Sequence, residues 1–185
     1  MHTVQKFFGH LHTVNAHRRM VRKLCFQCGL YWQGLTHDLS KYSPTEFWNG
    51  VRFYTGKASP HIGERKEYGY SKAWLHHKGR NKHHGEYWND IQPDGTTAPI
   101  VMPIKYLMEM ICDRVAASKI YLKDQYTDAA PLEYYRSHKD ENQFHETTRE
   151  ALETALEAIA LDGLDKVFSM LKPYVRIACK RGFEK

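Results

Sequence analysis

The sequence predicts an all-α fold, and three features of the chain carry this prediction. Apolar residues recur every three or four positions in most segments, the spacing that gathers them on one face of a helix. Residues that favour helix starts and ends stand at the borders of these segments, such as Pro44 at a start and Gly29 at an end. No segment shows the regular alternation that is typical of a strand. We therefore expect a helical bundle.

The first forty residues predict two helices. Apolar residues at helical spacing indicate a helix over about 3–28, and Gly29 follows it. A second, shorter helix is expected over 30–39. It would carry the adjacent pair His37 and Asp38 near its end.

The next segment begins with a helix-capping pattern. Ser43 is followed by Pro44 and, three residues after the serine, by Glu46, which predicts a capped helix that continues to about Tyr54. This capping role is enough to explain Glu46. Residues 56–69 combine glycine, proline and a dense run of charges, so we expect a solvated loop there.

Further helices are expected through the rest of the chain. The strongest periodicity, over 103–122, predicts a long helix with Asp113 at the edge of its apolar face. Tyr31-Trp32 and Tyr87-Trp88 are expected to be core residues. The other expected elements are a helical turn over 71–77, a short helix over 82–88 capped by Asn81, a loop over 91–99, helices beginning at Pro131 and covering 146–161, and a last helix interrupted near Pro173.

Length, composition and charge place limits on the protein's class. A chain of 185 residues can bury one core, and no shift in composition marks a boundary, so we expect a single domain over 1–185. The formal charge of +6 favours an anionic partner, such as a phosphate ester or nucleic acid. No apolar run approaches the roughly 20 residues that cross a bilayer, and the first residues do not resemble a signal peptide. We expect a cytoplasmic protein with no membrane partner.

The cysteines do not form a recognisable metal or redox motif. Cys25 and Cys28 make a C-x-x-C pattern inside a helical, apolar setting, and no second such pair completes a zinc site. A thioredoxin-like motif would follow a strand. We expect buried core thiols in a reducing compartment.

His37 and Asp38 are the first candidates for chemistry. An imidazole nitrogen beside a carboxylate oxygen suits Zn, Mn, Fe or Ni better than a closed thiolate site does. Adjacent helical residues diverge by about 100°, so both reach one ion only near a helix end or in a crowded pocket. The alternative is a helix end at which both residues face water.

The twelve histidines are unevenly spread. His76-His77 and His83-His84 flank a short segment that holds three cations, Lys78, Arg80 and Lys82. Protonated imidazoles beside three cations would repel one another, and a bound metal or phosphate would offset that cost. The alternative is a basic surface turn, with or without a nucleic-acid contact.

The order of these candidates resembles the HD-domain superfamily of metal-dependent phosphohydrolases. In that family a first helix supplies His, a second supplies His-Asp, and a late helix supplies Asp, as in His17, His37-Asp38 and Asp113. The resemblance covers about residues 10–122, with the helices of 131–185 packed on this region, and it implies an HD-domain-like helical bundle. His-Asp-Leu-Ser-Lys is similar to the His-Asp-x-x-Lys form of the cyclic-dinucleotide phosphodiesterases, but their Gly-Tyr-Pro signature is missing. The segment from His76 to His84, which we call the double-histidine segment, is more similar to Asn-x-His-His-x-x-Tyr-Trp of a small bacterial and phage family.

The resemblance implies one or two divalent transition-metal ions (Mn, Fe, Zn, Ni or Co). The implied ligands are His17, His37, Asp38 and Asp113, with Asp38 bridging to a second ion held by two histidines of the double-histidine segment. The pairs His76/His83 and His77/His84 have the same spacing. We prefer His77 with His84, because His84 would lie one turn into the expected helix.

The implied activity is hydrolysis of a phosphoester, on a nucleotide or a related small phosphorylated molecule, by metal-activated water. Asp38, Lys41 and Arg80 are the candidate catalytic residues, and Lys41, Lys78, Arg80 and Lys82 the candidates for binding the anionic substrate.

Two other functions fit the same residues. The same scaffold can hold a di-iron centre for redox chemistry with O₂, and the basic segment can serve a non-enzymatic nucleic-acid-binding module. Individual residues also have structural alternatives: His17 as a core histidine, Lys41 as a surface lysine, and Asp113 as a partner of Arg22.

Overall fold

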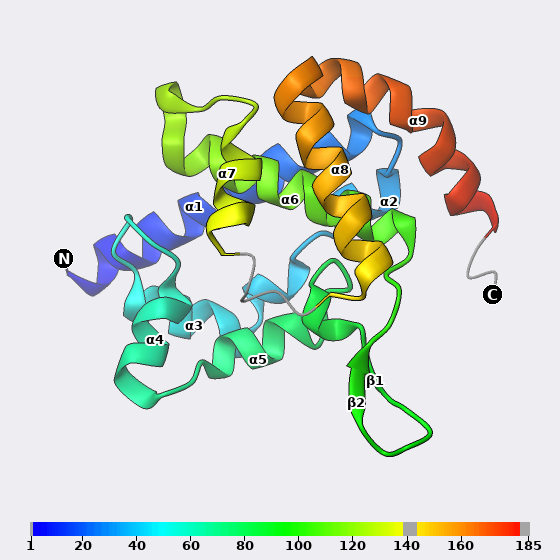
Figure 1. Ribbon diagram of the computed structural model, residues 1–185. Helices are drawn as coiled ribbons and strands as arrows, with labels where there is room; N and C mark the ends of the chain where they lie inside the picture. Colours follow the sequence, from blue (N-terminus) through cyan, green and yellow to red (C-terminus); the bar gives the residue numbers. More distant parts are fainter. Residues whose placement is uncertain (1, 139–143, 182–185) are drawn as a thin grey trace.

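The computed structural model describes residues 2–138 and 144–181, and within them the protein is a mostly helical single domain (Figure 1). The expected all-α class is confirmed, with one small addition, a two-stranded hairpin that extends from the bundle. The expected C-terminal region 131–185 falls partly outside the described residues. The α-helices are α1 (Thr3–Gln27), α2 (Tyr31–Thr36), α3 (Pro44–Phe53), α4 (Pro60–Tyr68), α5 (Lys72–Lys78), α6 (Ile104–Leu122), α7 (Ala130–Ser137), α8 (Glu146–Asp162) and α9 (Leu164–Arg181).

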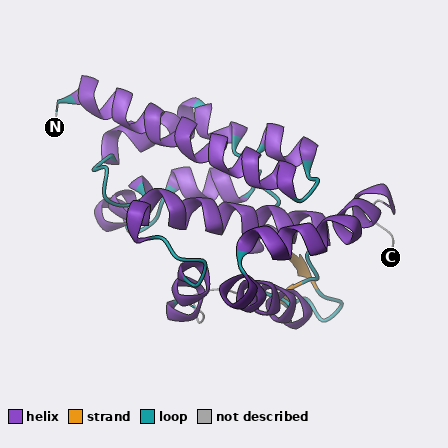
Figure 2. Cartoon of the chain, turned by 90° about the horizontal axis from the view of Figure 1, so that it is seen from above, coloured by secondary structure: helices purple, strands orange, loops and turns teal. Residues whose placement is uncertain are grey.

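Short elements join these helices. The hairpin consists of β1 (Asn89–Ile91) and β2 (Thr97–Pro99), which pair in antiparallel register with Asp90 opposite Ala98. The described residues also form the 3₁₀ helices η1 (Leu39–Tyr42), η2 (Gly85–Tyr87) and η3 (Lys123–Gln125). Figure 2 shows how small the strand pair is beside the helices. Within the described residues, none of the helices combines the length and the apolar character that crossing a membrane requires.

The hydrophobic core forms around the apolar face of α6. Helix α1 packs along α6, and α8 and α9 close the core from the other side. Val21 of α1, Ile111 of α6 and Phe168 of α9 are each 1% exposed or less. Because α6 turns its apolar residues toward this core, its opposite face is free to carry polar side chains.

Replacing Ile111 with alanine is expected to destabilise the fold strongly. The side chain is 1% exposed, so its loss removes buried apolar surface and leaves a cavity, at a cost of about 3 kcal/mol. The measurement is the free energy of unfolding in urea. Leu161→Ala is the matched control, because Leu161 is 87% exposed and its loss should change that free energy by less than about 0.5 kcal/mol. Equal effects from both variants would contradict this placement of the core.

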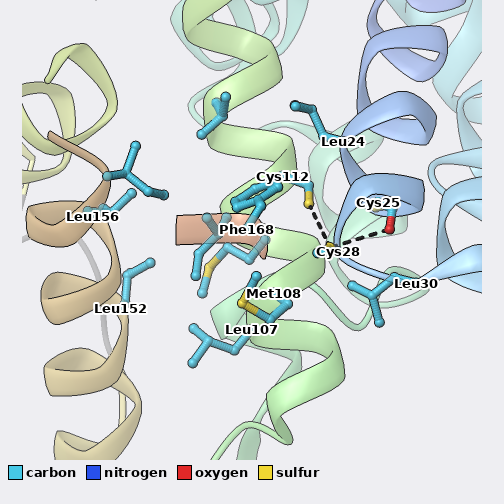
Figure 3. Packing of buried hydrophobic residues seen from close by; sticks show 14 of the residues in the cluster. Leu24, Cys25, Cys28, Leu30, Leu107, Met108, Cys112, Leu152, Leu156 and Phe168 are labelled. Carbon is cyan, nitrogen blue, oxygen red and sulfur yellow. Dashed lines mark hydrogen bonds between the residues drawn. The ribbon is translucent and has the colours of Figure 1, made fainter. Parts of the chain in front are cut away.

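The expected burial of the C-x-x-C cysteines is confirmed. Cys25, Cys28 and Cys112 are fully buried free thiols, and the sulfur atoms of Cys28 and Cys112 lie 3.8 Å apart between α1 and α6 (Figure 3). Burial raises the pKa of the Cys112 thiol well above its usual value. These cysteines therefore act as core residues.

Two expectations for the first half of the chain were wrong. Residues 56–69 are not all loop, because Ser59 and Pro60 begin α4 and Gly69, with φ +78°, ends it. Tyr31 and Trp32 are not core residues. Their exposed fractions are 55% and 72%, because α2 turns this edge to solvent.

Four further expectations, for segments from Asn81 onward, were also wrong, the last of them in part. Asn81 does not cap a helix over 82–88, since its side chain donates to Ser40 Oγ and to the His77 carbonyl instead. The expected loop over 91–99 contains part of the hairpin, whose turn uses Gly95 at φ +83°. Helix α9 continues through Pro173, because buried Phe168 and Val175 anchor it on both sides of the proline. Of the pair Tyr87-Trp88, only Trp88 is buried.

Candidate metal centre

The polar face of α6 meets a histidine of α1. His17 Nε2 lies 2.8 Å from Asp113 Oδ1, and the packing of α1 along α6 brings these two residues together. Asp113 also lies near His37, at 3.6 Å from its Nε2 atom. Asp113 therefore pairs with these histidines and not with Arg22, the alternative considered above.

His37 and Asp38 lie between α2 and η1, which corrects the expectation that a helix over 30–39 carries them. Helix α2 ends at Thr36, and Asp38 adopts the left-handed conformation, with φ +53°. This conformation is costly for a residue other than glycine and is concentrated at functional sites. Because His37 and Asp38 lie beyond the end of α2, their adjacent side chains can point to the same place, with His37 Nε2 at 3.3 Å from Asp38 Oδ2.

Arg18 of α1 holds this irregular segment in place. Its Nε donates to the His37 carbonyl at 2.7 Å, and its Nη2 donates to the Leu35 carbonyl at 3.1 Å. His37 and Asp38 are 2% and 1% exposed, so the alternative of a helix end facing water is wrong.

Three histidines from the double-histidine segment approach Asp38 from the other side. His77 stands near the end of α5, and His83 and His84 lie in the turn that follows. His77 Nε2 is 3.3 Å and His83 Nε2 is 3.5 Å from Asp38 Oδ1. His76 is outside this group, because its Nδ1 contacts Glu46 Oε1 at 2.6 Å.

The side chains form two donor sets that share Asp38. Within each set the donor atoms lie within 4.8 Å of one another. We call them set A and set B. Set A contains His17, His37, Asp38 and Asp113, and set B contains Asp38, His77, His83 and His84.

The spacing between Asp38 and the histidines around it fits a shared cation better than direct hydrogen bonds. Asp38 lies 3.3 to 3.9 Å from the facing nitrogens of four histidines, longer than ordinary hydrogen bonds. Ligands about 2.1 Å from one ion are separated by roughly 3.0–3.4 Å, close to these values. Several of the facing atoms are buried and lack a hydrogen-bond partner among the described residues, namely Nε2 of His37, His83 and His84 and Oδ1 of Asp38. A buried polar atom without a partner is costly, so this cluster is compatible with a metal site.

Two further carboxylates contact the far side of the histidine rings. Glu109 Oε1 lies 2.9 Å from His37 Nδ1 and 3.2 Å from His83 Nδ1. Glu46 Oε2 lies 2.7 Å from His77 Nδ1. A carboxylate that accepts the Nδ1 proton leaves Nε2 free as a ligand, an arrangement common in metal sites.

Comparison with known proteins assigns the chain to a family. Residues 6–158 match the model of a family described as a family of unknown function (DUF5662). The chain belongs to this family. The matched segment contains every residue of set A and set B. Neither the curated proteins nor the solved structures that were compared gave a match.

The buried charges of this DUF5662 protein stabilise one another. Burial opposes charge on Asp38, but His37 and Lys41 outweigh it and hold the pKa of Asp38 well below its usual range. Asp113 has a lowered pKa in the same way, because His17 and His37 outweigh the effect of burial. Burial, together with His83 and His77, lowers the pKa of His84 well below 6.5, which favours the neutral imidazole that metals bind.

Of the cationic residues predicted to bind substrate, Lys41 contacts the donor sets, and the other three have different surroundings. Lys41, on η1, has its Nζ 2.7 Å from Asp38 Oδ2 while its side chain is 32% exposed. Arg80 is exposed and donates to the His76 carbonyl at 3.4 Å. Lys82 is exposed, and its Nζ lies over the rings of Tyr87 and Tyr106. Lys78 is partly buried at the end of α5. The substrate-binding role of these four residues stays a prediction.

Glu109 and Glu46 are the site residues that the sequence reasoning missed. Glu109 precedes Asp113 by four positions, so the helical spacing alone puts both on one face of α6. Glu46 was explained by its capping position, and its backbone N–H does donate to Ser43 Oγ at 3.4 Å. Its carboxylate, however, turns to His76 and His77. Nothing local in the sequence indicates that pairing.

Proposed function

We propose that this DUF5662 protein is a metal-dependent phosphohydrolase that acts on a nucleotide or a related small phosphorylated molecule. One observation supports this proposal above all others. Two largely buried donor sets share Asp38, and the Lys41 ammonium lies 2.7 Å from the same carboxylate while its side chain is partly open to solvent. A phosphate at that position would meet a cation and the buried donor sets together.

The donors fit divalent transition metals. Set A and set B each combine imidazole nitrogen with carboxylate oxygen, a mixture that suits Mn, Fe, Co, Ni or Zn. When bound, such ions polarise a phosphoryl oxygen and lower the pKa of a coordinated water toward neutrality. Asp38 would contribute a ligand to both sets, because its Oδ1 faces His77 and His83 and its Oδ2 faces His37.

The order of the donors along the chain supports the resemblance to HD-domain phosphohydrolases. His17 comes from the first long helix, His37 and Asp38 follow the second helix, and Asp113 comes from the long helix α6. The histidines of set B lie between them in the chain. The substrate class proposed for this protein rests on that resemblance together with the position of Lys41.

Lys41 has a defined role in this proposal. Burial opposes charge on its ammonium, but Asp38 and Asp113 outweigh burial and raise the pKa of Lys41, so the group stays protonated. A protonated lysine can bind a phosphate oxygen and neutralise charge that develops during hydrolysis. The exposed Arg80 and Lys82 would raise the local concentration of an anionic substrate.

Lys41→Ala is expected to lower the hydrolysis of model phosphoesters on the order of 10²-fold in kcat/KM. The measurement is release of p-nitrophenol from its phosphate monoester and diester by protein loaded with Mn²⁺ or Co²⁺. Metal content should stay unchanged, because Lys41 is not a ligand. Lys66→Ala on exposed α4 is the control and should hydrolyse as the wild type does. A metal-loaded wild type without phosphoesterase activity would overturn the proposal.

A di-iron redox centre is the second candidate, and the shared carboxylate favours it. Paired irons are commonly bridged by carboxylates and surrounded by histidine and carboxylate ligands. Here Asp38 is the carboxylate that belongs to both donor sets. Elemental analysis and the visible spectrum of aerobically purified protein separate the two functions. Two irons per chain with a visible band, and no phosphoesterase activity, would favour the redox centre.

A further inference from the structure

We propose that Glu109 is a positioning residue that joins the two donor sets, so that both cation sites depend on this single carboxylate. The proposal rests on the metal centre of the proposed function, but on neither the substrate nor the reaction. Glu109 is 6% exposed and lies on α6, one turn before Asp113.

One oxygen of Glu109 serves a histidine of each set. Oε1 lies 2.9 Å from Nδ1 of His37, which belongs to set A, and 3.2 Å from Nδ1 of His83, which belongs to set B. The centroids of the two rings lie 4.4 Å apart, with the ring planes tilted by 37°. A shift of this carboxylate would therefore move both rings.

The contact selects the form of histidine that can bind a cation. A neutral imidazole carries its proton on one nitrogen and a lone pair on the other. When Glu109 accepts the protons on Nδ1, the lone pairs of both histidines stand on Nε2, which faces Asp38. These are the nitrogens without a hydrogen-bond partner among the described residues, so their lone pairs are available.

The same geometry argues against a third cation at Glu109. His37, His83 and Glu109 also lie close enough to form a ligand group. A cation there would need the Nδ1 lone pairs and would move the protons to Nε2. The 2.9 Å contact between Glu109 Oε1 and His37 Nδ1 is a hydrogen bond, whereas Nε2 of His37 and of His83 has no hydrogen-bond partner among the described residues, so Glu109 acts as an acceptor.

Glu46 provides a contrast within the same protein. Its Oε2 contacts His77 Nδ1 at 2.7 Å, and its Oε1 contacts His76, which belongs to neither set. Glu46 therefore positions a histidine of set B alone. The two glutamates are both buried, both at 6% exposure, so they form a matched pair for an experiment.

The test is calorimetric titration of metal-free protein with Zn²⁺ or Mn²⁺, comparing the wild type with Glu109→Ala, Glu109→Gln and Glu46→Ala. Mutation of a carboxylate behind a metal-binding histidine typically weakens affinity about 10–100-fold. We expect Glu109→Ala to weaken both binding steps by that amount and Glu46→Ala to weaken one step. Glu109→Gln keeps an acceptor oxygen without its charge, so both steps should weaken together, but by less.

A second readout separates positioning from structural damage. In zinc-loaded protein, the Nδ1–H resonances of His37 and His83 should both shift or exchange with solvent in Glu109→Ala, while that of His77 should not. Weakening of one step alone, or of neither, would overturn the proposal. If metal-free Glu109→Ala does not fold, Glu109→Gln is used instead, and weakening of one binding step alone, or of neither, again overturns the proposal. A folded wild type that binds no metal would overturn the metal centre itself, whereas loss confined to one step in Glu109→Ala would leave that centre standing.

Discussion

Asp38→Ala is expected to abolish the binding of both cations while leaving the protein helical. Asp38 is the one residue common to set A and set B, and each of its oxygens faces histidines that are otherwise held by different elements. No other carboxylate among the described residues replaces it at that point. Elemental analysis after loading and gel filtration should show a fall from about two ions per chain to none.

The design needs a control for charge and one for backbone conformation. Asp124→Ala removes an exposed aspartate on η3 and should keep full metal content. Asp38→Asn keeps one oxygen and tolerates the left-handed conformation, so it should lose the bridge but retain the fold. Far-ultraviolet circular dichroism should match the wild type in all three variants. Stoichiometric metal in Asp38→Ala would disprove the assignment of this centre.

Removal of metal by a chelator is expected to lower thermal stability. Nε2 of His37 and of His83 and Oδ1 of Asp38 are buried and find no hydrogen-bond partner within the described part of the chain, so a cation that binds the folded state satisfies atoms that otherwise cost free energy. An ion at 100 times its Kd stabilises the folded state by about 2.7 kcal/mol. For a chain of this length, that corresponds to a rise in Tm of about 5–11 °C.

Thermal unfolding followed by circular dichroism measures this effect. Protein dialysed against a chelator should unfold at a lower temperature, and Mn²⁺ or Zn²⁺ should restore Tm in a concentration-dependent way. Mg²⁺ is the control, because it prefers oxygen ligands and should raise Tm far less at a site rich in imidazole. Equal Tm values with and without transition metal would contradict a cation site in the buried cluster.

Much of the fold could be predicted from local sequence patterns. The helix over Thr3–Gln27 and the helix over Ile104–Leu122 follow from apolar periodicity, and Ser43 with Pro44 marks the start of α3. These signals lie within a few residues of the structure they produce. Where the signal is a charge run, as in the segment that forms α4, the helix was missed, because exposed helices carry little apolar periodicity.

The helical class and the inventory of donors, namely His17, His37-Asp38, the double-histidine segment and Asp113, could be predicted from local sequence patterns. How these donors meet depends on the packing of the bundle. This packing set Asp38 in a left-handed conformation between two sets, and it turned Glu46 and Glu109 toward histidine rings that lie 31 and 72 positions away. The difference lies in the distance along the chain over which each kind of interaction acts. Helix periodicity and capping act over one or two turns, whereas ring orientation depends on contacts of α3 with α5, and of α6 with the segments that carry His37 and His83, which form only when the bundle packs.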